Sequence, residues 1–332
     1  LSVLLLPALM GFLTPPAAAQ DSPDGRRGWG LDLTVGGAGL AIGNIPRVNG
    51  IRVNFRDSYL EEVNGLNLTF WPPPRTGSVG GTVRGIAVGL TAPTADRLLG
   101  LSLGGLAVVA EEEISGISLG GLASVTNGGA TGVNLGGLAT VAGEGHLRGL
   151  QLGGLAVVGN DGVEGISGGG LAVVAGEGDV TGLQLGGLAV VAGAGDLTGI
   201  SAGGLAVVAA EGVAKGVNLA GLAVVGLEGV EGLNLGGLAV VSEEYVRGLS
   251  VGAYKVEAPR GSWMAGAAWK VDVDDFEGIS VSAWNEHARR HRGLSIGLFN
   301  RTEELTGIQI GLLNYAGNNE RFPWLPLINA HF

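Results

Sequence analysis

Cysteine is absent from the chain, and aromatic residues make up only 5% of its 332 residues. Without thiols, neither disulfide bonds nor thiolate metal sites can stabilise the fold. Beyond Ala19 no apolar run reaches the roughly 18 residues that a transmembrane helix requires, so no such helix is expected. Basic residues are scarce, with 19 Lys and Arg against 30 Asp and Glu and a net charge of −11. A nucleic-acid partner, which would need a basic stripe, is therefore not expected.

Sequence patterns typical of catalysis are also lacking. No nucleophile–base pair, phosphate-binding loop or pair of carboxylates occurs at a recognisable spacing. The few histidines are scattered, at His146, His287, His291 and His331. We therefore expect no catalytic, cofactor-binding or metal-binding residues and no cofactor, and we interpret the chain as a protein without enzymatic activity.

The first residues have the character of a targeting signal. An apolar stretch from Leu1 to Leu13 is followed by Thr14-Pro15-Pro16 and then by Ala17-Ala18-Ala19, although a basic segment before it is missing. This order is typical of a hydrophobic region and its cleavage site, and it predicts a signal peptide over 1–19 with Gln20 as the first mature residue. A buried helix is the alternative. Export without disulfide bonds predicts the bacterial cell surface or outer membrane, with the periplasm as the alternative.

Glycine is abundant instead. The chain has 65 Gly and a mean hydropathy of +0.38, a mixture that indicates repeats. One phrase restarts nine times at spacings of 16 or 17 residues, with the consensus G-φ-(S/N/Q)-L-G-G-L-A-V-V and a short turn after it. The nine copies begin at Gly100, Gly116, Gly132, Gly149, Gly165, Gly182, Gly199, Gly216 and Gly232.

Looser copies flank this core. They begin upstream at Gly30, Gly50, Gly65 and Gly85, and downstream at Gly248, Gly278, Gly293 and Gly307. We divide the mature chain into N-terminal divergent β repeats (20–99), nine regular repeats (100–247), and C-terminal divergent β repeats with a terminal aromatic strand (248–332).

The composition of each copy predicts strands. Leu and Val alternate with polar residues and lead into Gly-, Glu- and Asp-rich turns, whereas a helix would carry adjacent glycines that cost about 1 kcal/mol each. The seventh position is Leu in all nine copies, from Leu106 to Leu238, and we predict that this column points inward. The third position is polar and predicts a side-chain ladder on a stacked β surface. Its residues are Ser102, Ser118, Asn134, Gln151, Ser167, Gln184, Ser201, Asn218 and Asn234.

Two all-β architectures satisfy these patterns: a β-solenoid with coils of about 15–17 residues, and an up-and-down outer-membrane β-barrel. The nine similar turns favour the solenoid, as does the presence of only one aromatic residue, Tyr245, between Gly100 and Arg247. The alternating apolar residues that lead to Phe332 favour the barrel. We predict the solenoid and keep the barrel as the alternative.

The tail of the chain carries a related phrase. It reads Gly293-Leu-Ser-Ile-Gly-Leu-Phe-Asn300, then Gly307-Ile-Gln-Ile-Gly-Leu-Leu-Asn-Tyr315, then Trp324-Leu-Pro-Leu-Ile-Asn329. In this it resembles the leptospiral-type bacterial surface-repeat proteins, which are built of G-φ-x-φ-G-φ-φ-N copies behind a signal peptide. The nine core copies depart from that pattern by carrying Val-Val in place of the final Asn. The resemblance implies a surface or outer-envelope location, and it implies no catalytic residue and no ligand.

Three groups of residues are candidates for a metal site. His287 and His291 have the i, i+4 spacing of helical ligands, but three arginines surround them and we expect a solvated basic loop. The turns at 176–179 and 193–196 are similar to calcium-binding repeats, yet their period differs, so we interpret them as tight turns. The acidic residues of 272–277 are expected in a solvated loop.

From these observations we interpret the chain as an exported structural repeat protein of the envelope. It would act as a scaffold or adhesin-like surface for an unknown surface or envelope partner, with outer-membrane association among the options. The alternative function, which belongs to the barrel, is a pore or transporter.

Overall fold

The computed structural model describes residues 30–58, 60–73 and 80–332, so the predicted signal peptide lies outside the described residues. The described part consists of β-strands and turns and contains no helix. The chain forms two units, Leu1–Gly128 and Gly129–Phe332, which we call the N-terminal and C-terminal units.

In the N-terminal unit, strands β2 to β8 pair with one another in parallel, and only β1 runs antiparallel, to β2. The strands are β1 (Gly30–Val35), β2 (Ala38–Gly43), β3 (Arg47–Arg56), β4 (Glu62–Trp71), β5 (Thr82–Gly89), β6 (Thr94–Gly104), β7 (Ala107–Gly120) and β8 (Ala123–Thr126).

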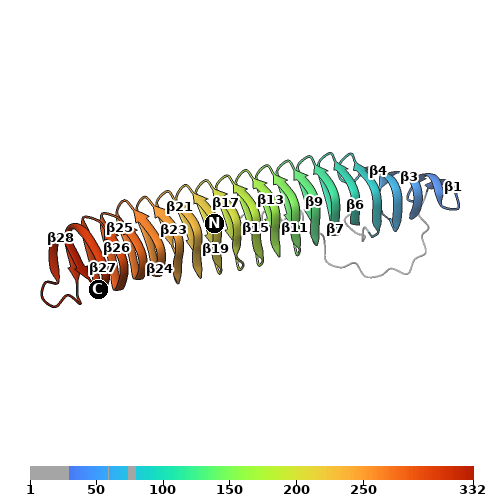
Figure 1. The fold of residues 1–332 in the computed structure, drawn as a ribbon. Helices are drawn as coiled ribbons and strands as arrows, with labels where there is room; N and C mark the ends of the chain where they lie inside the picture. Colours follow the sequence, from blue (N-terminus) through green and yellow to red (C-terminus); the bar gives the residue numbers. More distant parts are fainter. Residues whose placement is uncertain (1–29, 59, 74–79) are drawn as a thin grey trace. The chain divides into compact units, whose positions relative to one another are not determined.

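In the C-terminal unit, long strands alternate with short ones, and each pairs in parallel with its counterpart one coil away (Figure 1). The long strands are β9 (Gly129–Gly136), β11 (His146–Gly153), β13 (Gly162–Gly169), β15 (Asp179–Gly186), β17 (Leu197–Gly203), β19 (Val213–Ala220), β21 (Gly229–Gly236) and β23 (Tyr245–Gly252). The short strands are β10 (Ala139–Ala142), β12 (Ala156–Gly159), β14 (Ala172–Ala175), β16 (Ala189–Ala192), β18 (Ala206–Ala209), β20 (Ala223–Gly226) and β22 (Ala239–Val241). Toward its C-terminal end the strands lengthen, in β24 (Lys255–Ala267), β25 (Lys270–Val281), β26 (Trp284–Ile296) and β27 (Phe299–Ala316), followed by β28 (Trp324–His331).

This pairing makes the fold a β-solenoid, in which each repeat is one coil. Gly165 lies beside Gly182 and Gly182 beside Gly199 in the parallel ladder, so equivalent residues of successive copies stack in columns. The predicted solenoid is confirmed. The alternative barrel is wrong, because an up-and-down barrel would pair consecutive copies antiparallel.

The glycine that opens each copy lies within the long strand and has a positive φ. It is distinct from the Gly-Gly corner at positions five and six. Gly182 has φ +108°, a conformation that residues with a Cβ rarely adopt, and a Cβ there would overlap the carbonyl oxygen of Gly165. The structure shifts two copy boundaries. Gly39, not Gly30, stacks on Gly50, and Trp263 occupies the glycine position of a coil between Gly248 and Gly278 that the sequence pattern had not revealed.

The interior of the coils is filled by small apolar and polar columns. The ninth position is valine in most copies and is fully buried, as in Val173 and Val190. The residue two places before the opening glycine is also fully buried, as in Val180. The polar third position is also buried, with at most 2% exposed in any of the nine copies. The predicted surface ladder is therefore an interior ladder, in which Asn218 donates to Asn234 at 2.8 Å.

The prediction that the Leu column points inward is wrong. The nine leucines from Leu106 to Leu238 are 44–53% exposed. The physical reason is the pleat, which sends successive side chains to opposite sides. Because the side chain of the third residue of each copy points inward, those of the second and fourth point outward, and the seventh residue lies on the outer side of the Gly-Gly corner at positions five and six.

The terminal strands reverse the strand direction. β1 is antiparallel to β2, and β28 is antiparallel to β27 with a register shift between Gly311 and Asn314. β28 also contains Pro326, which has no N–H to donate, and Leu327 at φ +65°. The alternating residues before Phe332, which had favoured a barrel strand, belong to this reversed strand.

Candidate binding face

The C-terminal unit presents rows of exposed aliphatic side chains along its coils. They are the outward residues at positions two, four and seven of the copies from Gly132 to Gly232, and we call them the aliphatic face. Its exposed members are Leu138, Leu152, Leu155, Ile166, Leu171, Leu185, Leu188, Ile200, Leu205, Leu219, Leu222, Leu235 and Leu238.

Backbone and interior hydrogen bonds hold these side chains outward. The buried Gln184 amide donates to the Thr181 carbonyl at 2.9 Å, which fixes the inward side of β15 and leaves Leu185 on the outside. At the corner, the Leu188 N–H donates to the Leu171 carbonyl at 2.7 Å, so the ladder continues through the bend. The leucines of successive coils therefore stack one above another in a continuous row.

The aliphatic face carries no charge. None of the first ten residues in any of the nine regular copies is Asp, Glu, Lys or Arg. Glu177, Glu211, Glu228 and Glu243 are exposed in the turns that follow, and Glu164 and Glu231 lie in strands, directly before the opening glycine of the next copy. Each coil is thus amphipathic in cross-section, with an uncharged apolar side and an acidic turn.

Exposure of this face leaves hydrophobic stabilisation unused. Complete burial of a leucine side chain is worth about 1.5–3 kcal/mol, so a half-exposed leucine forgoes roughly 1 kcal/mol. Contiguous apolar patches of this kind mark interaction sites on soluble proteins. A partner that covered the face would recover roughly 10 kcal/mol before the costs of association.

Aromatic residues continue the face toward the C-terminal end. The Tyr254 N–H donates to the Leu238 carbonyl at 2.7 Å, so Tyr254 extends the leucine row by one coil. Trp269 follows in the next coil, and Trp284 of the coil after it lies one column aside, because its Cα pairs with that of Lys270. The Trp284 N–H donates to the Trp269 carbonyl at 2.8 Å. All three side chains are exposed.

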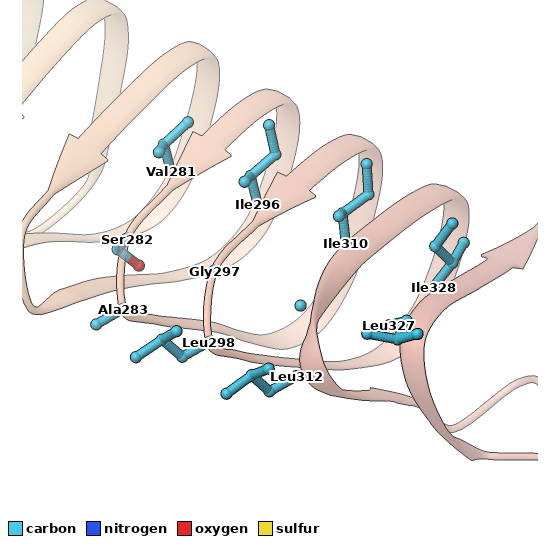
Figure 2. Close-up of a pocket in the computed structure, with 11 residues that line it drawn as sticks. Val281, Ser282, Ala283, Ile296, Gly297, Leu298, Ile310, Leu312, Leu327 and Ile328 are labelled. Atoms are coloured by element: carbon cyan, nitrogen blue, oxygen red, sulfur yellow. The ribbon is translucent and has the colours of Figure 1, made fainter.

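A shallow apolar groove lies beyond them, in the coils of β25 to β28. Figure 2 shows Val281, Ile296 and Ile310 in one row, with Leu298 and Leu312 along the other side. The corner residues at Ser282 and Gly297 lie between the two rows, and Leu327 and Ile328 of β28 complete the lining. The groove therefore lies between two outward rows of the tail copies, at positions four and six.

The histidine pair is buried, so the prediction of a solvated basic loop is wrong. His287 and His291 lie in β26, stack on each other with ring centroids 4.5 Å apart, and both stack on Phe276. A register shift after His287 turns Ala288, Arg289 and Arg290 outward and returns His291 to the interior. Because the two imidazole rings stack in parallel, the lone pairs of their nitrogens point side by side. The nitrogens of His287 and His291 therefore do not converge on one metal ion.

Burial sets the protonation of this pair. It lowers the pKa of His287 to about 4, against the opposing effect of a hydrogen bond with the Val273 carbonyl at 2.8 Å. It lowers the pKa of His291 to about 3, and the neighbouring His287 contributes to the shift. Both imidazoles are neutral at pH 7, and His291 has no hydrogen-bond partner for either nitrogen.

The acidic residues 272–277 lie in strand β25, not in the expected loop. Asp272 forms ion pairs of 3.0 Å with both Lys255 and Lys270, and Lys270 also pairs with Glu286 at 2.7 Å. Partial burial opposes ionisation of Asp272, but the two ammonium groups outweigh it and lower its pKa. Asp275 pairs separately with Arg289 at 3.0 Å, so the carboxylates are divided between two cation groups.

The turn aspartates link neighbouring coils. The Asp179 carboxylate accepts the Asp196 N–H at 2.8 Å, and Asp196 in turn accepts the Val213 N–H at 2.8 Å and pairs with Lys215 at 2.6 Å. Partial burial of Asp196 is outweighed by the Lys215 and amide contacts, which lower its pKa. These contacts support the interpretation of the segments as tight turns. In the described ranges, no cluster of three or more metal-binding side chains occurs.

Sequence reasoning missed a buried ion pair in the N-terminal unit. Arg52 and Asp57 are both fully buried and pair with each other. Arg52 also donates to the Ile45 carbonyl at 2.9 Å and to Asn67 at 3.0 Å. Strand alternation from buried Val48 would have placed Arg52 on the inward side. The network is closed on itself and offers no free charge to a ligand.

No family model, curated protein or solved structure matches this chain. Within residues 30–332, apart from the few undescribed positions, there is no helix with the length and apolar character needed to cross a bilayer.

Proposed function

We propose that this chain is a non-catalytic, exported repeat protein of the bacterial envelope that acts as a scaffold through its aliphatic face. The single observation that carries the proposal is the exposure of the leucine row of the C-terminal unit, 44–52% for each of its seven members from Leu138 to Leu238. A row of half-exposed leucines supported by a polar interior serves binding rather than stability. The apolar start and Ala17-Ala18-Ala19 support export.

The arrangement of polar groups supports a role without catalysis. The buried histidines are neutral and stacked, and the carboxylates of β25 and of the turns pair with lysine, arginine or backbone amides. The titratable groups described above are therefore engaged in structural contacts. The outward residues at positions two, four and seven of the core copies are aliphatic or small and offer no acid, base or nucleophile.

Export is tested by expressing the full chain in a bacterial host, fractionating the cells and sequencing the N-terminus of the recovered protein. We expect the chain in the envelope fraction with Gln20 as its first residue. A chain that keeps Leu1 and stays in the cytoplasmic fraction would refute the export half of the proposal.

The role of the face is tested in the same fractions with a face variant, Leu155→Ser, Leu171→Ser, Leu188→Ser and Leu205→Ser together. The matched control is a turn variant that replaces the exposed Glu177, Glu211, Glu228 and Glu243 by Ser. Both should be exported, and only the face variant should shift from the envelope to the soluble fraction. Equal retention of the two variants would contradict binding through the aliphatic face.

A further inference from the structure

The aliphatic face has the chemistry of a lipid-binding surface. We infer that it lies against the acyl region of a lipid layer whose headgroups carry no net charge. This inference deepens the proposed function and rests on it, because it names the partner of the same face. Three features of the face distinguish a lipid layer from a protein partner.

The first feature is composition. The exposed side chains of the face are leucine and isoleucine, and the outward residues between them are glycine, alanine and valine. Protein interfaces carry about one hydrogen bond per 100–200 Å² and are enriched in Tyr, Trp, Met and Arg. The face offers no side chain that could donate or accept such bonds. An acyl phase requires none.

The second feature is repetition. Leu171, Leu188 and Leu205 occupy equivalent places in successive coils, in the same ladder register. A protein partner, including a second copy of this chain, would make the same leucine contacts after sliding by one coil. Specificity is a difference between alternative modes of binding, and this face makes successive modes nearly equal. A fluid lipid layer needs no unique register.

The third feature is the placement of the remaining groups. Exposed Tyr254 and Trp269 continue the leucine row at one end, with exposed Trp284 in the neighbouring column. Trp and Tyr prefer the boundary between acyl chains and headgroups. The exposed acidic side chains Glu177, Glu211, Glu228 and Glu243 lie in the turns, outside the first ten residues of each copy, and the net charge is −11. Segments that lie in the plane of a lipid interface combine an apolar face with charged residues outside that face. The acidic charge selects against anionic lipid.

The inference is tested by flotation of the purified full chain with phosphatidylcholine vesicles, and with vesicles of equal parts phosphatidylcholine and phosphatidylglycerol. We expect binding to the first and weaker binding to the second, with the difference reduced by salt. Tryptophan fluorescence should be quenched by bromine-labelled phosphatidylcholine, a readout that needs no variant. Absence of both flotation and quenching would overturn the inference.

The two variants described above complete the test. The face variant should lose at least about tenfold in vesicle affinity while its circular dichroism and melting temperature stay near those of the parent. The turn variant should bind phosphatidylcholine as the parent does and bind the anionic vesicles better. Unchanged affinity of a correctly folded face variant would overturn the inference.

Measurement of the molar mass in solution separates a lipid layer from a second copy. A parent that dimerises, a face variant that is monomeric and vesicles that bind neither would assign the face to a second copy and overturn the lipid assignment. Envelope retention that depends on the face without vesicle binding would leave the proposed function standing and the lipid inference refuted.

Discussion

At the scale of the single residue, Trp263 differs from its neighbours in the column, Gly248 and Gly278, which are both glycines. It takes the place of the opening glycine at φ +87°, and its side chain is 66% exposed. A bulky residue in this region of backbone space stores about 1–3 kcal/mol of strain. We therefore expect Trp263→Gly to raise the free energy of unfolding by about 1 kcal/mol or more, as measured by denaturant titration.

Gly232 supplies the matched control for this substitution. It lies in the same column at φ +99°, and a Cβ there would overlap the Gly216 carbonyl oxygen. Gly232→Ala should therefore destabilise the protein. If Trp263→Gly lowers stability instead, the side chain makes contacts worth more than its backbone strain.

Two neighbouring side chains that follow the Gly-Gly corner at Gly186-Gly187 should respond differently to a charge. Val190 is fully buried, and Val190→Asp should cost about 3–5 kcal/mol because the carboxylate has no partner inside the coil. Leu188, only two residues earlier, is 46% exposed, and Leu188→Asp should cost less than about 1 kcal/mol. Thermal melting of the two variants checks this, and equal losses would show that the outward assignment of the leucine row is wrong.

At the scale of the element, the histidine pair makes β25 and β26 sensitive to acid. The pKa values of His287 and His291 are lowered to about 4 and about 3, while in the unfolded chain both titrate near 6.5. Between about pH 6.5 and these lower values the unfolded state binds more protons. Stability should therefore fall as the pH falls below about 6.5, by up to about 1.4 kcal/mol per pH unit for each histidine.

The variant His291→Phe isolates this effect from the titration of carboxylates. It keeps a ring to stack on His287 and Phe276 and removes the two unpartnered nitrogens. Its stability advantage over the parent should be larger at pH 5 than at pH 8, as measured by denaturant titration at both values. An advantage that does not change with pH would contradict burial of a neutral imidazole.

Elements were predictable to the extent that a local pattern specified them. The glycine period predicted the coils and their register, because each opening glycine has a positive φ and stacks on the opening glycine of the neighbouring coil. It missed the coil of Trp263, in which the glycine itself is absent. The histidine pair was missed because three arginines in the same segment indicated solvent, and only a register shift in the strand separates them from the interior.

The inward side of the strands could not be read from hydrophobicity. Alternation defines two sets of side chains but does not say which set is buried, and the usual rule assigns the apolar set to the core. Here the polar set of Ser, Asn and Gln is inside and the Leu set is outside. The candidate binding face follows from this inversion, so it became visible only in the structure.

At the scale of the whole molecule, stability should follow coil number, because each coil of a solenoid contacts only its neighbours. Deletion of Gly182 to Thr198 removes one coil and brings the copy of Gly165 onto that of Gly199 in the same register. The shortened chain should retain its β circular dichroism and its cooperative unfolding, with a small loss of stability. Deletion of only Gly182 to Leu188 removes part of a coil, misaligns the columns, and should abolish cooperative unfolding. A full-coil deletion that unfolds would show that stability is not distributed coil by coil.

The reversed strand β28 has a consequence for growth. The open end of a stack of near-identical parallel coils presents unpaired backbone donors and acceptors, on which another coil can add. In the C-terminal unit that open end meets β28, whose antiparallel direction, Pro326 and positive-φ Leu327 disrupt the repeating pattern of donors and acceptors. Further coils therefore cannot add to this end in the regular parallel register. We expect β28 to prevent chains of this repetitive sequence from assembling end to end into fibres.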